Sequence, residues 1–305
     1  MPNLSIGLIG AGAVGSFYAG HMAKHGADVT ILTRTPDAYT DPIHIESPKG
    51  DFTFHPKAIQ SLSEVCDPFD VLILATKALP SIDAVSLVQP FMSKNTILMI
   101  IQNGIFIEDD LLASYDQNIL RCLAFICVSR HSKTHIHHMD FGSLSVGGLN
   151  CTLNDLADHP LFQLFPQLDI TVRLSPDIQQ SIWEKLVWNA PFNPLSVVYN
   201  GATTAELLSN PTSLSKIRTI MQEVQLAATY ANITITDEFI DEKIQQTQQM
   251  VPYKTSMCLD YESGSDIEVE AILGHLLQFG EDHSFDLPEI RSLYRDIQLL
   301  INKPK

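Results

Sequence analysis

The sequence is poor in cysteine, in positive charge and in long apolar runs, and each shortage argues against a class of protein. Its five cysteines are an odd number without a C-x-x-C pair, which argues against a disulfide framework and favours reduced thiols in a cytoplasmic protein. Lysine and arginine total 19 against 35 acidic residues, a net charge of −16, so nucleic acids and anionic membranes are poor partners. No apolar run reaches membrane-spanning length, and the glycine-rich turn at residue 10 begins too early for us to expect a signal peptide.

The chain does contain enough apolar residues for a folded core. Its 305 residues are 45% hydrophobic, which suits one large or two ordinary domains. Apolar strands alternate with helical segments up to about residue 174, and helical periodicity dominates afterwards. We therefore predict an α/β fold with a Rossmann-like, doubly wound parallel sheet over 1–174 and an all-helical domain over 175–305. Helices are expected at 16–25, 81–91, 108–115, 156–168, 178–189, 205–208, 213–231, 237–248, 268–283 and 288–301.

A G-x-G-x-x-G sequence lies between the apolar run 4–9 and the first helical segment. Its first glycine permits a tight turn, the second lets the backbone approach a pyrophosphate, and the third lets helix and strand pack closely. The phosphates then meet free N–H groups at the positive end of the helix dipole. A second apolar strand at 29–32 completes a β-α-β unit, so we predict a dinucleotide site rather than a turn without a ligand. Its contact residues are Gly10, Ala11, Gly12, Ala13, Val14 and Gly15.

The end of the second strand bears on the choice of cofactor. NAD-binding units place an acid there for the ribose 2′-hydroxyl, whereas this chain has Thr33-Arg34-Thr35 and no acid before Asp37. The planar cation of Arg34 suits a 2′-phosphate. We therefore predict NADPH rather than NADH, the alternative being a solvated surface arginine.

Lys77 and Asn103 each follow an apolar strand, at 70–75 and 96–101. Ligands of doubly wound sheets bind outside the carboxyl ends of the strands, which favours a functional role over helix capping for both. Later, Glu268 and Glu270 alternate with apolar residues, a pattern in which one acid should face solvent while the other can face inward.

Lys185 and Asn189 are four residues apart in an amphipathic helical segment, so they share one face. Pro191 and Pro194 are expected to kink or end this helix, and Asn193 and Asn200 follow. Buried polar side chains need partners. These side chains therefore either satisfy one another or line a pocket for a polar ligand, and their spacing leaves both alternatives open.

Four histidines, at positions 131, 135, 137 and 138, gather in a strand-like stretch. Their spacing lacks a clear ligand pattern, so we interpret them as strand surface and predict no metal site.

Taken together, the chain resembles the ketopantoate reductase (2-dehydropantoate 2-reductase) family over nearly its whole length. The motifs that carry the resemblance are Gly10-x-Gly12-x-x-Gly15, Thr76-Lys77-Ala78, Gln102-Asn103-Gly104, Trp183-x-Lys185-Leu186-x-x-Asn189, Asn193-Pro194-Leu195-Ser196, Thr255-Ser256-Met257-x-x-Asp260 and Glu268-Val269-Glu270-Ala271-Ile272-x-Gly274. The resemblance implies a Rossmann domain, a helical domain and an active site in the cleft between them, in a cytoplasmic enzyme of pantothenate and coenzyme A biosynthesis.

The resemblance also implies a mechanism. NADPH would deliver hydride to the C2 ketone of 2-dehydropantoate, giving (R)-pantoate. Lys185 matches the catalytic lysine that binds the ketone oxygen and supplies the proton, and Glu268 matches a glutamate that holds this lysine or the substrate hydroxyl. Further matches to substrate positions are Asn103, Asn189, Asn193, Asn200 and Ser256; further matches to cofactor positions are Arg34, Lys77, Asn103 and Glu268.

Two alternatives to this function remain. The same scaffold could reduce other branched or aromatic 2-oxo acids, because pocket shape sets the substrate. A non-catalytic NADPH sensor is the second alternative, against which the presence of both Lys185 and Glu268 argues. The helical domain is also large enough to offer an apolar face for a homodimer.

Overall fold

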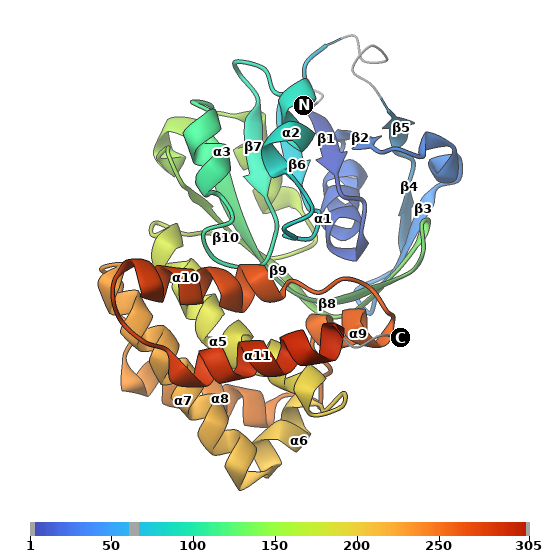
Figure 1. The fold of residues 1–305 in the computed structure, drawn as a ribbon. Coiled ribbons are helices and arrows are strands. Elements are labelled where there is room, and N and C mark those ends of the chain that lie inside the picture. Colours follow the sequence, from blue (N-terminus) through green and yellow to red (C-terminus); the bar gives the residue numbers. More distant parts are fainter. Residues whose placement is uncertain (1–3, 61–66, 303–305) are drawn as a thin grey trace. The chain divides into compact units, whose positions relative to one another are not determined.

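The computed structural model describes residues 4–60 and 67–302, which form two compact units (Figure 1). The sheet unit comprises Met1–Lys77, Ile82–Gln102 and Glu108–Ile178, and the helical unit comprises Ala78–Ser81, Asn103–Ile107 and Gln179–Lys305. Two short loop segments of the N-terminal half therefore pack with the helical unit. The domain limits expected from the sequence, 1–174 and 175–305, stay a prediction.

The sheet unit is built on one curled, mostly parallel sheet, which confirms the predicted fold class. Its strands follow the order β4-β3-β9-β8-β7-β6-β1-β2-β5, and β10 pairs with β9. Two pairs, β3 with β4 and β8 with β9, are antiparallel, which the prediction of a parallel sheet did not include. The strands are β1 (Ser5–Ile9), β2 (Asp28–Leu32), β3 (Ile43–Glu46), β4 (Phe52–Phe54), β5 (Lys57–Ile59), β6 (Val71–Leu74), β7 (Ile97–Ile100), β8 (Ile119–Ser132), β9 (His135–Gly148) and β10 (Val172–Leu174).

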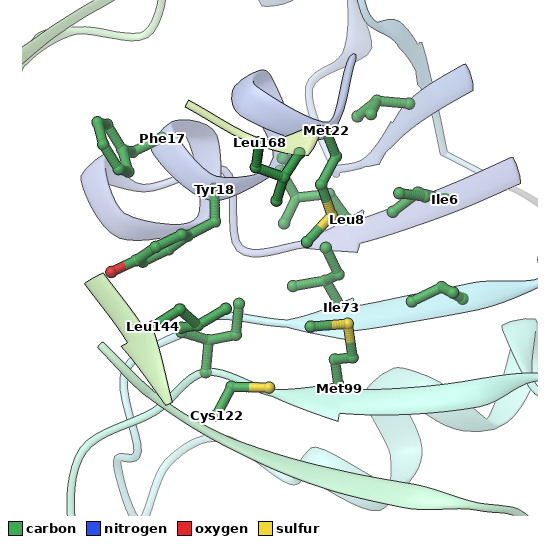
Figure 2. Close-up of a cluster of buried hydrophobic side chains, with 14 of the residues drawn as sticks. Ile6, Leu8, Phe17, Tyr18, Met22, Ile73, Met99, Cys122, Leu144 and Leu168 are labelled. Carbon is green, nitrogen blue, oxygen red and sulfur yellow. The ribbon is translucent and has the colours of Figure 1, made fainter. Parts of the chain in front are cut away.

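Helix α1 (Ala13–Lys24) supplies much of the core of this unit. Its Tyr18 and Met22 side chains, like Leu8 and Ile73 on the strands, are completely buried, and Figure 2 shows them packed together. Gly26 ends the helix as the sequence predicts, with a positive φ of 98° and its N–H bonded to a carbonyl of the last turn. Removing these side chains from water is a main stabilising term for the unit.

The remaining helices of the sheet unit are shorter than predicted. The segments expected at 81–91 and 156–168 contain Pro90 and Pro166, and each proline lies at the start of a new one-turn 3₁₀-helix. Proline has no N–H to continue an α-helix, which accounts for the break. These helices are α2 (Ala84–Val88), η3 (Gln89–Phe91), α3 (Asp109–Ser114), η4 (Leu153–Leu156), α4 (Pro160–Leu164) and η5 (Phe165–Gln167), and η1 (Pro36–Tyr39) follows β2.

The helical unit is helical throughout, as predicted. Helix α9 is missing from the prediction, although Thr255 caps it by accepting from the Cys258 N–H. Among the described residues, no helix combines the length and apolar content that a membrane crossing needs. The helices are α5 (Ile178–Val198), α6 (Thr204–Ser209), α7 (Pro211–Tyr230), α8 (Asp237–Gln249), α9 (Ser256–Glu262), the π-helix η6 (Glu270–Gly274), α10 (His275–Asp282) and α11 (Pro288–Ile301).

Helix α5 does not end at its prolines. Pro191 and Pro194 both lie inside it, and the helix continues to Val198, so the expectation that they end the helix is wrong. Each proline removes one helical hydrogen bond. The neighbouring Phe192 and Leu195 side chains are completely buried, and their packing offsets that loss.

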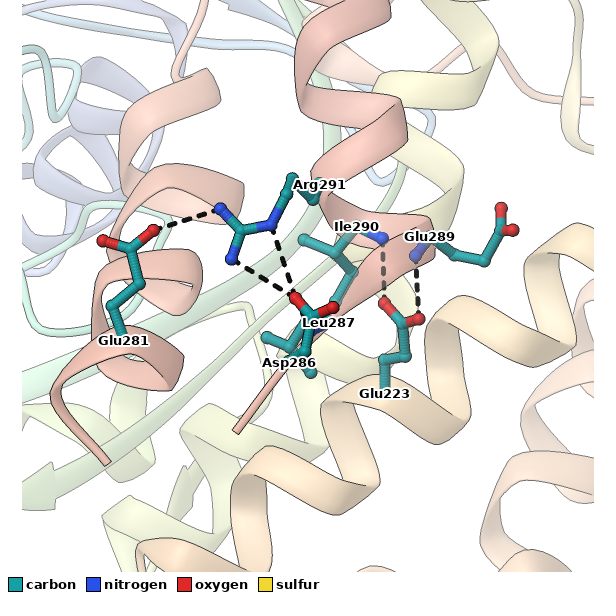
Figure 3. A network of polar contacts seen from close by, with 7 residues as sticks. All are labelled: Glu223, Glu281, Asp286, Leu287, Glu289, Ile290 and Arg291. Atoms are coloured by element: carbon teal, nitrogen blue, oxygen red, sulfur yellow. Dashed lines mark hydrogen bonds and ion pairs between the residues drawn. The ribbon is translucent and has the colours of Figure 1, made fainter. Parts of the chain in front are cut away.

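Helix α11 begins on a carboxylate from another helix. It has no side-chain cap of its own, but Glu223 of α7 accepts the N–H groups of Glu289 and Ile290, both at 2.8 Å. Figure 3 shows this contact beside the ion pairs of Arg291. A negative charge at a helix N-terminus is favourable, so Glu223 fixes α11 against α7.

The described cysteines are free thiols, in line with the sequence. Burial raises the pKa of the Cys122 thiol to about 12, which makes it a poor nucleophile. Cys66 lies outside the described residues.

Candidate active site

The glycine-rich turn of the sheet unit has the shape that its sequence predicts. Gly10 has a φ of +94°, and a Cβ there would lie 2.4 Å from the Thr76 backbone nitrogen. A Cβ on Gly15 would lie 2.3 Å from the Gly10 carbonyl oxygen. Gly12 differs, because a Cβ there would meet no atom within 4 Å. Two glycines are therefore needed for close packing, and the third leaves open space beside the turn.

That open space adjoins the N-terminus of α1. Gly12 is the N-cap residue, no side chain caps the helix, and its first turn carries no acid. Ala13 and Val14 begin the helix, and Ala11 is buried beneath the turn. Uncapped N–H groups at the positive end of a helix are a binding site for phosphate, so these residues fit the pyrophosphate of a dinucleotide.

Arg34 follows β2 and is exposed, and no acidic residue pairs with it in the part of the chain that the structure describes. Lys77, which follows β6, is half-buried. Gln102 links the loop after β7 to the loop after β6. Its buried side-chain amide donates hydrogen bonds to the Thr76 carbonyl oxygen at 2.9 Å and to the Thr76 hydroxyl oxygen at 3.1 Å. Sequence reasoning did not assign Gln102 a function, although it lies in one of the quoted motifs.

In the helical unit, three predicted site residues form one hydrogen-bonded chain. Lys185 Nζ donates to Asn103 Oδ1 at 2.9 Å. The other end of the same amide, Asn103 Nδ2, donates to Glu268 Oε2 at 3.4 Å, and Glu268 Oε1 accepts the Ala78 N–H at 2.9 Å. The neutral amide thus offers its acceptor to the ammonium and its donor to the carboxylate, the only arrangement that suits both charges.

The segment that carries Asn103 is held by the π-helix η6. In η6 the His275 N–H bonds to Glu270 O, which releases Ala271 O from the regular helical pattern. Ala271 O instead accepts the Ile105 N–H at 2.9 Å, and the His275 ring contacts Ile105 O through Nδ1 at 2.8 Å. Gly104 fits only as glycine, because its φ is +108° and a Cβ would lie 2.6 Å from Ala271. π-helical turns often occur at functional sites.

Glu270 does not face solvent, and neither does Glu268, so the expectation that one of them would is wrong. Both are half-buried. Glu270 Oε1 accepts from Tyr294 Oη at 2.5 Å and from Gln298 Nε2 at 2.9 Å, both on α11.

The asparagines of α5 do not satisfy one another. Asn189 is 7% exposed and Asn193 is 3% exposed, yet neither side-chain amide hydrogen-bonds to any residue within 4–60 or 67–302. With Lys185 they lie at intervals of four along one face of the helix. Neither amide is among the fully enclosed polar atoms that lack a partner, so both reach accessible space, and this face favours the second alternative, a site for a polar ligand.

The other two predicted substrate residues are exposed. Ser256 is the first residue of α9, and this end of α9 is joined to α5 because Ser196 Oγ contacts Thr255 Oγ1 at 2.6 Å. Asn200 lies beyond the end of α5 with a φ of +55°. It lines a cavity of about 300 Å³ whose wall comes from residues 199–202, 206, 207, 210 and 213.

The histidines divide into two groups. His131, His135 and His137 have ring contacts with one another, and none of the three is buried. His138 is buried and contacts Ser47 Oγ at 2.9 Å, so the expectation of strand surface is wrong for this residue. Its ring packs on Phe17, with centroids 4.5 Å apart. In the described ranges no three histidine, cysteine or acidic side chains are arranged to hold a metal ion.

Comparison with known proteins assigns these features to one family. Residues 6–150 match the family profile described as Ketopantoate reductase PanE/ApbA, and residues 177–300 match Ketopantoate reductase PanE/ApbA C terminal. A 2-dehydropantoate 2-reductase of Nostoc sp. is 30% identical over 96% of this chain and 94% of its own length. The chain belongs to the ketopantoate reductase family. It is therefore an oxidoreductase that depends on a nicotinamide cofactor, NAD(H) or NADP(H).

Solved structures support the ketopantoate reductase assignment. The 2-dehydropantoate 2-reductase of Methylococcus capsulatus has a TM-score of 0.90 at 33% identity, with 99% of both chains covered. A D-mandelate dehydrogenase in complex with NADH and anilino(oxo)acetate has a TM-score of 0.87 at 20% identity over 97% of this chain and 98% of its own. At that identity the second likeness shows the shared fold alone.

Proposed function

We propose that this ketopantoate reductase uses NADPH to reduce the C2 ketone of 2-dehydropantoate to (R)-pantoate. The observation that carries the proposal is the chain from Lys185 through Asn103 to Glu268. It combines a proton-donating cation with a carboxylate in a family of nicotinamide-dependent reductases. The names of the relatives in Nostoc and Methylococcus support the choice of substrate.

The cofactor binds, in this proposal, at the glycine-rich turn and the N-terminus of α1. The backbone from Gly10 to Gly15 holds the pyrophosphate, and Arg34 pairs with the 2′-phosphate that distinguishes NADPH from NADH. Lys77, Asn103 and Glu268 complete the cofactor contacts. When bound, the cofactor supplies the hydride that reduces the ketone carbon.

Lys185 acts as the proton donor. Its ammonium group hydrogen-bonds the ketone oxygen, stabilises the negative charge that develops there, and supplies the proton of the new hydroxyl. Asn103 orients the ammonium through a neutral acceptor. Glu268 holds the other end of Asn103 and is itself fixed by the Ala78 N–H.

The unpartnered amides of Asn189 and Asn193 bind polar groups of the substrate. The two residues are little exposed, and their amides form no hydrogen bond within the described residues while still reaching accessible space, which supports this role. Ser256 and Asn200 add hydroxyl and amide contacts, with Ser256 directed to the substrate carboxylate.

A homodimer through the helical unit is part of the same proposal, as is a cytoplasmic location. Leu226 and Tyr230 of α7 are 43% and 45% exposed, and Leu299 of α11, a helix that contacts α7, is 67% exposed. Exposed apolar side chains on helices that pack together are typical of interaction surfaces. Sedimentation velocity at several protein concentrations tests this point.

The decisive experiment is a turnover panel. NADPH oxidation is followed with 2-dehydropantoate, 2-oxoisovalerate and an aromatic 2-oxo acid. A kcat/KM at least about tenfold higher for 2-dehydropantoate supports the proposal. Comparable values on the other acids would favour the broader reductase, and NADPH binding without turnover on any acid would favour a sensor.

A further inference from the structure

Two cations, one near the end of β8 and one in the turn between β8 and β9, lie against the predicted cofactor-binding residues of the sheet unit. Lys133 Nζ donates to Thr35 Oγ1 at 2.9 Å, and Thr35 directly follows Arg34. Arg130 Nη1 donates to the Ala11 carbonyl oxygen, inside the glycine-rich turn, at 3.0 Å. Neither residue belongs to a motif that the family resemblance used, and about a hundred residues of chain separate each from its partner.

The topology of the sheet explains this proximity. Strand β9 pairs with β3, and the Thr134 carbonyl oxygen accepts the His44 N–H at 2.8 Å. The turn between β8 and β9 is thereby fixed beside the chain that leads from β2 into β3 (Figure 1). Lys133 Nζ also lies 6.0 Å from the centroid of the Tyr39 ring, in the 3₁₀-helix of that connecting segment. The pairing of β9 with β3 and the Tyr39 ring therefore hold Lys133 in place beside Thr35.

The charges at this place are unusual for such an acidic protein. Arg34, Arg130 and Lys133 have no acidic partner within the residues that the structure describes, although the chain carries a net charge of −16. By contrast, Lys24, Lys57, Lys216 and Lys254 each pair with an acid. Asp37 is the one acid between Thr33 and Thr40, so the local balance is positive. Cations without an acidic partner, placed beside the predicted cofactor-binding residues, favour an anionic ligand.

We propose that Lys133 is a second cation for the 2′-phosphate of NADPH, acting beside Arg34. Arg130 is a positioning residue that holds the end of β8, and with it the following turn, against the glycine-rich turn. The two roles differ because the hydrogen-bond partners differ. Lys133 contacts Thr35, the residue next to Arg34, whereas Arg130 donates to a carbonyl oxygen of the glycine-rich turn. The inference rests on the proposed use of NADPH and adds a specificity-determining residue to it.

The test measures the Kd of NADPH and of NADH for the full chain without substrate, by quenching of protein fluorescence. Lys133→Met should weaken NADPH by about tenfold, the effect of losing one charge-assisted contact at an exposed site, and should leave NADH within about twofold. Lys133→Arg should restore NADPH binding. The matched control is Lys94→Met. Lys94 is an exposed lysine just before β7, at the amino-terminal edge of the parallel strands and so at the edge opposite the cofactor-binding turn. Its loss should change neither Kd.

Arg130 is tested in a double-mutant cycle. Arg130→Met should weaken NADPH in the presence of Lys133 and have little further effect in the Lys133→Met background, because it acts through that residue. If Lys133→Met weakens both cofactors equally or neither of them, while the native protein prefers NADPH, the role of Lys133 is wrong and the proposed function stands. If the native protein shows no preference for NADPH, both the cofactor part of the proposed function and this inference fail.

Discussion

Lys185 of α5 donates a hydrogen bond to Asn103, which lies 82 residues earlier in the chain, at 2.9 Å. The same Asn103 side chain donates to Glu268 at 3.4 Å. A neutral amide therefore connects a cation with an anion in one line. This arrangement orients the ammonium, a group that can stabilise an oxygen that becomes negative during a reaction.

Replacement of Lys185 should impair the chemical step of the reduction and leave NADPH binding nearly unchanged. Lys185→Ala should lower kcat by about 10² to 10⁴, the range for loss of a general acid, and leave the Kd of NADPH within about twofold. Lys185→Arg keeps the charge, but arginine does not release its proton near neutral pH, so its kcat should stay low. Stopped-flow reduction and a separate binding titration measure the two effects. An alanine variant with native kcat would contradict the proposed proton donor.

His275 should act on turnover through the segment that carries Asn103. His275→Leu removes the contact with Ile105 O and should lower kcat by about tenfold with little change in the KM for NADPH, in line with one lost hydrogen bond. In His275→Asn the side-chain amide can donate at the same place, so kcat should recover. Equal loss in both variants, or a native kcat in the leucine variant, would show that the contact does not position Asn103.

Asn193 should be more important to activity than to stability. Asn193→Ala removes an amide that has no hydrogen-bond partner in the described chain and that reaches accessible space, so urea unfolding without ligand should show nearly unchanged stability. Its kcat/KM should fall by about tenfold, since a polar contact to substrate is lost. Ser196→Ala is the contrasting variant. Its hydroxyl bonds to Asn193 O at 2.9 Å and to Thr255, so its loss should lower stability.

Stability should fall in mild acid because of His21. Burial lowers the pKa of His21 from 6.5 to about 4, and its Nδ1 has no hydrogen-bond partner among the described residues. The folded state therefore binds fewer protons than the unfolded chain, so the stabilising contribution is complete above pH 6.5 and is lost as the pH falls toward 4. One such group gives a slope of at most about 1.4 kcal/mol per pH unit.

Urea unfolding of the native protein and of His21→Leu across this pH range checks the prediction. Burial also lowers the pKa of His138 and of His159, but both residues remain in the variant, so the difference between the two slopes isolates His21. Identical slopes would show that His21 does not titrate on unfolding in this range.

The glycine-rich turn could be predicted because its requirements are local. Gly10 needs a positive φ, and a Cβ on Gly15 would meet the Gly10 carbonyl oxygen, while the flanking strand and helix are visible in the hydrophobic pattern; only the close approach of Gly10 to Thr76 depends on a distant segment. That Lys185, Asn189 and Asn193 share one face of α5 could also be predicted, because residues four apart in a helix lie on the same side. Local spacing could not show whether the asparagines bond to one another, since that depends on their rotamers and surroundings.

Other features depend on contacts between distant segments. The π-helix at Glu270 changes the side-chain register by one residue, and Lys133 reaches Thr35 only because β9 pairs with β3. For a related reason the sequence could not decide between a kink and an end of the helix at the prolines of α5, and the end is the alternative that the structure excludes. Propensity expects a break at Pro191, whereas the buried side chains around it keep the helix together.

The two compact units cannot be separated by one cut in the chain. Asn103 follows directly from Gln102 of the sheet unit, yet it packs with Lys185 and Glu268 in the helical unit. A fragment that begins at Gln179 would contain the lysine and the glutamate without the amide that links them. A chimera of two related reductases joined at this single point would likewise take its asparagine from one parent and its lysine from the other, so a matched exchange must transfer three separate segments of sequence.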